Sequence, residues 1–196
     1  MHLSKIFIPF QKPKDIYKIH QDLWKTLDSQ QQRFLYRIEQ HKAGYGAEIL
    51  MQSITEPQTT ASVKILATRE YSFTLMENQQ LRFLLVANPI RMGRVDRKTK
   101  KQIVKPCRIP LIKENEQEDW LKRKLNNLAT LDSLIIRPCT PLYFHKQKTG
   151  GGKITPVTFE GILTVQKPDE LQQTIQNGIG AAKAFGCGLL SIAPIK

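Results

Sequence analysis

Alternating apolar and polar residues in the N-terminal half predict several strands, with a helix after the first of them. Residues 3–10 alternate and are rich in β-branched and aromatic side chains, which is typical of a half-buried strand. Apolar residues then recur at helical spacing and predict a helix over residues 15–27. Further strands are expected at residues 33–40, 47–53 and 80–90, and the ambiguous segment 63–71 is expected to be mainly extended. This order indicates a βαββαβ unit of the ferredoxin-like kind, with its second helix degraded.

The C-terminal half predicts a second α+β unit of similar size. Residues 113–127 form a helical pattern with acidic residues first and basic residues last, as the helix dipole favours. A second helix is expected to begin at Pro168, which suits an early helical position. One or two strands are expected within residues 131–147, with further strands at 154–166 and 187–194.

Residues 91–105 interrupt these patterns. The segment has seven basic residues, one acidic residue and no apolar period. It is predicted to be a solvated loop or linker and to mark a domain boundary, which gives domains at residues 1–90 and 91–196. A second basic segment, residues 145–153, is predicted to be a flexible turn.

Charge indicates the kind of partner. The 196 residues carry a formal net charge of +13, and the self-repulsion of such an excess favours an anionic partner. Nucleic acid is the first candidate and an anionic membrane the second. No stretch approaches the ~20 apolar residues of a membrane span, and the apolar N-terminal run is too short for a signal peptide. Cys107, Cys139 and Cys187 lie far apart without a CxxC pair, so neither disulfides nor zinc are expected, and a cytoplasmic location fits.

The segment GIGAAKAFGCGLLSI, residues 178–192, combines four glycines with one lysine. It is not a dinucleotide-binding fingerprint, because the third glycine is missing and a helix precedes the loop where a strand should. Two interpretations remain. The loop could lay exposed N–H groups against a phosphodiester backbone, or it could be a glycine helix cap with a tight connection into a strand. The net charge favours the phosphate contact.

Tyr17 and His20 are the candidate catalytic residues, because an i,i+3 pair shares one face of a helix. An imidazole with a pKa near ~6.5 could take the proton of a ribose 2′-OH or protonate a 5′-oxygen. A tyrosine could donate to a phosphate oxygen, and Lys18 or Lys183 could stabilise extra charge on the phosphorus. Alternatively, Tyr17 and His20 only cover the solvent edge of the helix. The motifs GxSxG and HExxH are absent from the sequence.

Four segments in this order resemble the CasE family, the CRISPR RNA-processing endoribonucleases of type I-E systems within the RAMP superfamily. They are LSKIFIPF, YKIHQDLWKTL followed by RFLYRIE, LRFLLVANP, and GIGAAKAFGCGLLSIAP. The resemblance implies an α+β fold of two tandem ferredoxin-like (RRM-like) domains. It implies cleavage of pre-crRNA at the 3′ base of the repeat stem without metal or cofactor, giving a 2′,3′-cyclic phosphate and a 5′-OH. It also assigns catalysis to His20 and Tyr17.

The resemblance further implies binding of the CRISPR repeat hairpin, retention as a subunit of Cascade with other Cascade subunits as partners, and a monomer when isolated. The family inserts a basic β-hairpin of its second domain into RNA, for which residues 143–157 are the candidate. The expected RNA-binding residues are Arg91, Arg94, Arg97, Lys98, Lys100, Lys101, Lys146, Lys148, Lys153, Gly178, Gly180, Lys183, Gly186 and Gly188. Two alternatives stay open: a catalytically silent RAMP-type RNA-binding subunit, and a basic ribosome-associated protein.

Overall fold

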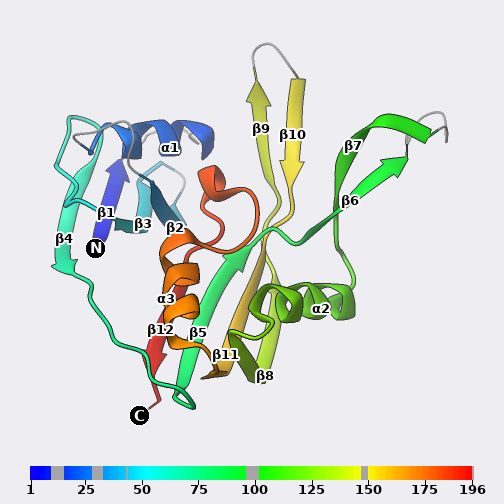
Figure 1. The fold of residues 1–196 in the computed structure, drawn as a ribbon. Coiled ribbons are helices and arrows are strands. Elements are labelled where there is room, and N and C mark those ends of the chain that lie inside the picture. The colour runs from blue at the N-terminus through cyan, green and yellow to red at the C-terminus, as the bar shows by residue number, and fades with distance from the viewer. Residues whose placement is uncertain (10–15, 28–32, 43, 96–101, 147–149, 196) are drawn as a thin grey trace.

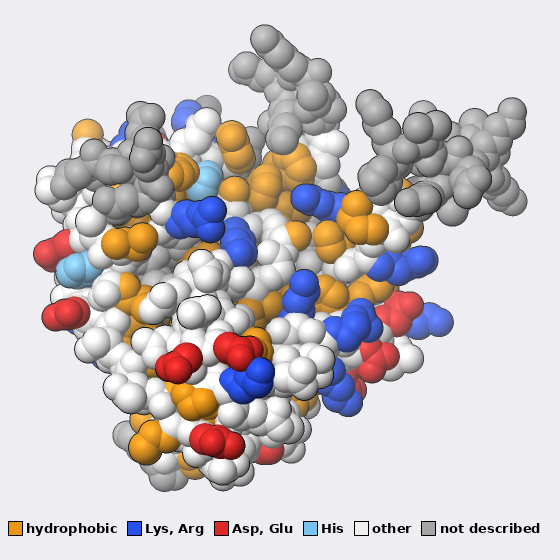
Figure 2. All heavy atoms as spheres, viewed as in Figure 1, with side chains coloured by type: hydrophobic (Ala, Val, Ile, Leu, Met, Phe, Trp, Pro, Cys, Tyr) orange, Lys and Arg blue, Asp and Glu red, His pale blue; other side chains and the backbone are white. Residues whose placement is uncertain are grey.

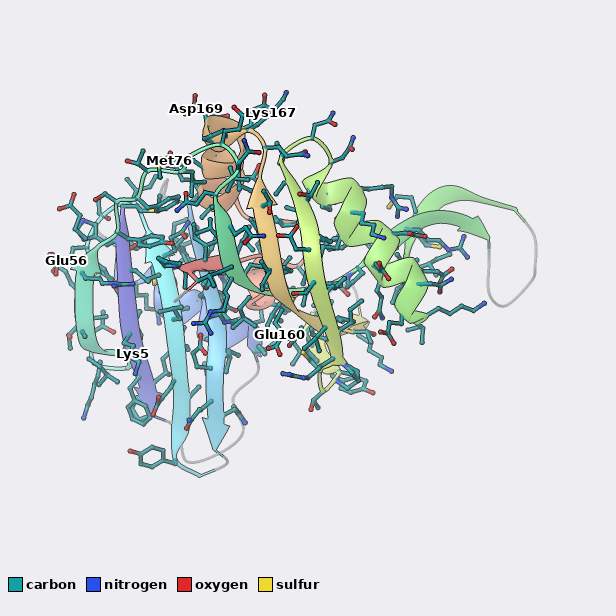
Figure 3. All side chains as sticks on the ribbon, turned by 90° about the horizontal axis from the view of Figure 1, so that it is seen from below. Lys5, Glu56, Met76, Glu160, Lys167 and Asp169 are labelled. Carbon is teal, nitrogen blue, oxygen red and sulfur yellow. The ribbon has the colours of Figure 1, made fainter. Side chains whose placement is uncertain are left out.

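Two four-stranded antiparallel sheets lie side by side and carry most of the chain (Figures 1 and 3). The computed structural model describes residues 1–9, 16–27, 33–42, 44–95, 102–146 and 150–195, with the backbone alone at residues 42, 94–95, 102–106, 145–146 and 150. In this part of the chain no helix is both long and apolar enough to cross a membrane.

The first sheet has the strand order β2-β3-β1-β4 and is covered by α1. Its elements are β1 (His2–Pro9), α1 (Ile16–Trp24), β2 (Phe34–Lys42), β3 (Gly46–Ser53) and β4 (Lys64–Glu70). Residues 54–63 contain no helix, in agreement with the prediction that the second helix of this unit is degraded.

The alternation along β1 explains how α1 is held. Ile6 and Ile8 are fully buried on one face of the strand, and Ile19 and Leu23 bury the facing stripe of α1. Burying such a side chain contributes about 1.5–3 kcal/mol, so this one core fixes the helix that carries the candidate catalytic residues.

The second sheet has the order β12-β5-β11-β8, with α2 and α3 packed on it. Its elements are β5 (Gln80–Ala87), α2 (Glu114–Leu125), β8 (Ala129–Pro138), β11 (Val157–Val165), α3 (Pro168–Asn177) and β12 (Leu190–Pro194). When strands are counted within each sheet, both sheets have the order 4-1-3-2. The two tandem ferredoxin-like units are therefore confirmed.

One strand belongs to a different sheet from the one predicted. Residues 80–90 were expected to complete the first unit, but β5 pairs with β11 and β12 in the second sheet. Strand β4 takes the edge position of the first sheet, beside β1. The apolar pattern of a strand does not reveal which other strands it pairs with. The sequence alone therefore could not assign β5 to the second sheet. We propose that the boundary between the two units lies in residues 71–79, where the chain passes from β4 to β5.

Two long hairpins project from the body (Figure 1). They pair β6 (Ile90–Val95) with β7 (Gln102–Pro110), and β9 (Leu142–Lys146) with β10 (Gly150–Ile154). The prediction of an unstructured linker over residues 91–105 was therefore wrong for residues 91–95 and 102–105. The strands of a two-stranded ribbon are held by backbone hydrogen bonds along their shared edge and bury little apolar surface. Their sequence therefore lacks a strong alternation of apolar and polar residues. The second hairpin confirms the hairpin expected within residues 143–157.

The loop after α3 connects the two units. It contains the short 3₁₀ helix η1 (Lys183–Phe185) and returns into β12. Gly178 caps α3 at a φ of +74°, and a Cβ there would lie 2.7 Å from Leu35 of the first unit and 2.9 Å from the Gly188 carbonyl oxygen. Nearby, Gln52 Nε2 on β3 donates a hydrogen bond to the Ile175 carbonyl oxygen on α3 over 3.1 Å.

We expect Gly178→Ala to destabilise the protein by about 3 kcal/mol, because backbone strain at φ +74° and ψ 157° adds to a clash with Leu35 and the Gly188 carbonyl oxygen. Gly44→Ala is the matched control, because Gly44 has a φ of +76° with nothing within 4 Å of the added Cβ. It should cost only about 1 kcal/mol, the backbone strain alone. Urea unfolding curves measure both values. Equal losses would show that the packing of Gly178 on Leu35 contributes nothing.

Candidate functional site

His20 lies within a cluster of aromatic rings on α1 and β2. Its ring stacks on Phe34 at a centroid distance of 5.0 Å and on Tyr36 at 6.1 Å, and it meets the edge of Trp24 at 6.1 Å. Tyr17, one turn earlier on α1, has its ring 6.4 Å from the imidazole. The predicted pair Tyr17 and His20 is therefore brought together, with Tyr17 exposed and His20 half-buried.

A hydrogen bond bears on which nitrogen carries the proton when the imidazole is neutral. The indole Nε1–H of Trp24 donates to Nε2 of His20 over 3.0 Å. Because an indole nitrogen only donates, Nε2 must present its lone pair, and the proton of the neutral ring sits on Nδ1. Nδ1 is buried and has no hydrogen-bond partner within the described residues.

Burial lowers the pKa of His20 below its ordinary value of 6.5. The aromatic rings remove water from around the imidazole, and this disfavours the charged form. The neutral form is the one that can accept a proton, so the site is electrostatically set for a general base at neutral pH.

The loop after α3 brings the second unit to this cluster. The ring of Phe185 lies 6.0 Å from that of Tyr17 and 4.7 Å from that of Phe144 on β9. The Tyr36 hydroxyl donates to the Ala184 carbonyl oxygen over 2.9 Å. Helix α1, strand β2, the loop and the β9–β10 hairpin therefore meet at one place.

The loop glycines are explained by packing. An added Cβ at Gly180 would lie 2.9 Å from Trp120, and one at Gly186 would lie 3.3 Å from Tyr36. Three of the four loop glycines also have their backbone amides engaged: Gly178 donates to Thr174, Gly186 to Lys183 and Gly188 to Val86. These three N–H groups are already paired, so a phosphate contact by this loop depends on its other groups.

Lys183 is the basic group that the loop presents, and two further cations accompany it. Its Nζ donates to the Asn177 carbonyl oxygen over 2.6 Å, while burial and the charges of Arg33 and Lys124 lower its pKa. The Lys124 ammonium lies 5.9 Å from the ring centre of Trp120, the residue against which Gly180 packs. Sequence reasoning missed Arg33 and Lys124, because only the fold brings three separate segments together.

A second basic group lies on the other side of Phe185. Arg108 on β7 and Lys153 on β10 line a cavity of about 240 Å³ together with Ala182 and Phe185 of the loop. Arg108 was also missed by the sequence analysis. Figure 2 shows Lys and Arg side chains across this face, from the loop toward α2.

Three of the remaining predicted RNA-binding residues lie on the two hairpins. Arg91 is exposed on β6, and the backbones of Arg94 and Lys146 lie in β6 and β9. Five of the predicted residues lie outside the described part of the chain: Arg97, Lys98, Lys100, Lys101 and Lys148. Within the described residues, no group of three His, Cys, Asp or Glu side chains is arranged to hold a metal ion.

A larger cavity, of about 630 Å³, adjoins the aromatic cluster between the two units. Arg37 and His41 of β2, Leu142 and Tyr143 of β9, and Phe185 of the loop are among the residues that line it. Arg37 is itself buried and paired, with Nη2 2.7 Å from Glu39 Oε1 and Nη1 2.9 Å from Ser191 Oγ. Its charge is used to join β2 to β12.

Comparison with known proteins identifies the family. The family model described as "CRISPR associated protein" matches residues 1–194. The "CRISPR system Cascade subunit CasE" of Escherichia coli (strain K12) is 38% identical over 200 residues, covering 100% of both chains. The chain belongs to the CasE family of CRISPR-associated proteins.

Solved CasE-family structures have the same fold. The crystal structure of Cas6e from Escherichia coli K-12 matches with a TM-score of 0.87 and 39% identity, covering 100% of both chains. The structure of "CRISPR endoribonuclease Cse3 bound to 19 nt RNA" matches with a TM-score of 0.78 and 26% identity, covering 99% of this chain and 100% of that one.

We expect the imidazole of His20 to titrate below pH 6.5 in the folded protein and near pH 6.5 in the urea-unfolded chain, because only the folded state buries it. NMR titration of the His20 ring protons measures both midpoints. Since the unfolded state then binds more protons, stability falls as the pH drops below 6.5. A folded midpoint at or above 6.5 would contradict the burial argument.

Proposed function

We propose that this protein is a CRISPR RNA-processing endoribonuclease that binds the repeat stem-loop and cuts it at the 3′ base of the stem. The observation that carries the proposal is the neutral imidazole of His20, held beside Tyr17 where a basic loop of the second unit closes over α1. The printed names of the relatives support it: one is a Cascade subunit, and another is an endoribonuclease bound to RNA.

In the proposed reaction His20 acts as the general base. It takes the proton of the ribose 2′-OH, the 2′-oxygen forms a bond to the adjacent phosphorus, and the bond to the 5′-oxygen breaks. The products are a 2′,3′-cyclic phosphate and a 5′-OH once the leaving oxygen has gained a proton. Tyr17 would donate a hydrogen bond to the scissile phosphate, and Lys183 would stabilise its added charge. The lowered pKa of His20 favours the base role over the acid role, which needs the charged ring.

The two basic groups beside Phe185 give the RNA a path across both units. Arg33, Lys124 and Lys183 would hold the backbone on one side, and Arg108 and Lys153 on the other. The major groove of A-form RNA is deep and narrow, so recognition by the β9–β10 hairpin would rest on phosphates and on the open end of the stem. The protein would then keep its product and serve as a subunit of Cascade.

A catalytically silent RNA-binding subunit is the second candidate, and one observation favours it. Nε2 of His20 is occupied by Trp24 and Nδ1 is buried, so neither ring nitrogen is open to a substrate in this conformation. This candidate predicts the same RNA affinity without a cut.

We expect His20→Ala to lower single-turnover cleavage of a CRISPR repeat hairpin in EDTA by at least ~100-fold, the usual contribution of a general base. Hairpin affinity should change little, because a half-buried residue offers little contact surface. His2→Ala on β1 is the control for loss of a histidine elsewhere. Gel analysis of the products gives the rate and the cut position, and end-group analysis gives the cyclic phosphate.

The outcomes separate the two candidates. A single cut at the 3′ base of the stem that is lost in His20→Ala supports the nuclease. Tight binding without cleavage by the wild type would assign the protein to the silent class. Undiminished cleavage by His20→Ala would remove His20 from the mechanism.

Neutral variants of the cation cluster should weaken RNA binding in a salt-dependent way. Arg33→Gln and Lys124→Gln should each reduce the slope of log affinity against log salt concentration by about 1, because each lost phosphate contact releases one counterion fewer. Lys5→Gln is the control, since Figure 3 shows Lys5 on β1 of the first sheet. Filter binding over a salt series measures the slopes. Slopes equal to that of Lys5→Gln would place the RNA elsewhere.

A further inference from the structure

Trp24 is held in place by the same cluster that holds His20. It lies one helical turn after His20 on α1, and its ring meets Phe34 edge-on at a centroid distance of 5.3 Å. Packing against Phe34 on β2 therefore helps to aim the indole N–H at Nε2, in addition to the i,i+4 spacing on α1. Tryptophan has only this one donor, and His20 takes it.

We propose that Trp24 is a positioning residue that holds His20 as the neutral tautomer with its proton on Nδ1, through a hydrogen bond to Nε2. The consequence for catalysis rests on the proposed function, in which His20 is the base. The assignment of the tautomer does not depend on that function. An imidazolium ring carries a proton on both nitrogens and cannot accept the indole N–H. The hydrogen bond therefore favours the neutral ring beyond what burial alone achieves.

The bond also identifies the reacting nitrogen. In this tautomer the only lone pair that can take a proton is on Nε2. The 2′-OH of the substrate must replace the indole N–H there, so that the O–H bond breaks as the Nε2–H bond forms. Trp24 thus keeps Nε2 unprotonated until the 2′-OH of the substrate replaces the indole N–H. The proton on the buried Nδ1 is retained throughout.

The groups that face His20 allow a clean comparison. Tyr17 on α1 and Tyr36 on β2 are the titratable side chains whose rings lie against the imidazole, and burial raises the pKa of Tyr36 so that it stays neutral. Arg33 before β2 and Lys183 in the loop are cations on the neighbouring segments. All four remain unchanged in a Trp24 variant.

The first experiment needs no mutation. The ¹⁵N chemical shifts of His20 in the wild-type protein, at a pH above its titration, report which nitrogen carries the proton. We expect the proton on Nδ1 and an unprotonated Nε2. A ring with its proton on Nε2 would overturn the proposal, whatever the result of the cleavage assay.

The second experiment removes the donor and keeps an aromatic ring. In Trp24→Phe the share of His20 protonated on Nε2 should rise. The proton affinity of His20 should rise roughly threefold, because the neutral ring loses a hydrogen bond. The acid limb of the single-turnover pH–rate profile should move to higher pH by the same amount. Tyr71→Phe is the control for the NMR measurement, since the ring of Tyr71 lies against Phe73 and Arg69, outside the aromatic cluster of His20.

Each result decides the matter. Unchanged tautomer populations in Trp24→Phe would overturn the proposal. They would do so even if the pKa of His20 rises, because added hydration alone would explain that rise. A shifted tautomer and pKa in a protein whose His20→Ala variant still cuts RNA would keep the role of Trp24 toward the ring and reject His20 as the base.

Discussion

The loop of residues 178–188 packs between the two ferredoxin-like units, and the geometry of the candidate site depends on that contact. Gly178 lies against Leu35, Gly180 against Trp120 and Gly186 against Tyr36. At each of these positions a side chain would need space that another residue fills. The loop can therefore approach both units only as bare backbone, and this approach places Phe185 against Tyr17. These glycines act on the site through the close packing that they allow, and direct contact of the loop glycines with RNA stays a prediction.

The packing that builds the site also limits its reactivity. The aromatic rings around His20 lower its pKa and so favour a neutral base, but they also bury Nδ1 and bring Trp24 to Nε2. A fully hydrated imidazole would have open nitrogens, yet a larger part of it would be charged near neutral pH. In the free protein the imidazole is kept neutral, but neither of its nitrogens is open. In the proposed reaction, a substrate that displaces the Trp24 hydrogen bond would open Nε2 while the ring stays neutral.

The sequence predicted the local elements well and their partners less well. Strict alternation and helical spacing located β1, α1 and most later elements, because each buries one face against a core. The membership of β5 in the second sheet could not be read from its residues, because pairing is non-local. The β6–β7 ribbon was missed because backbone pairing holds it without an apolar pattern. The cations Arg33 and Lys124 meet Lys183 only after folding. By contrast, the Trp24–His20 contact is an i,i+4 pair that the sequence itself displays, and attention to the indole donor would have found it.

The basic residues separate into those that hold the fold and those that leave charge unbalanced. Arg37 is buried between Glu39 and Ser191, and Arg137 pairs with Glu160 across the second sheet, so both charges are used within the protein. In the described part of the chain no acidic side chain forms an ion pair with Arg33, Lys124 or Lys183. Burial, and then repulsion from Arg33 and Lys124, lower the pKa of Lys183, and both are a free-energy cost of the unbound state. A phosphodiester placed among these three groups would relieve that cost, so in the proposed function the cluster that destabilises the free protein would add to its affinity for RNA.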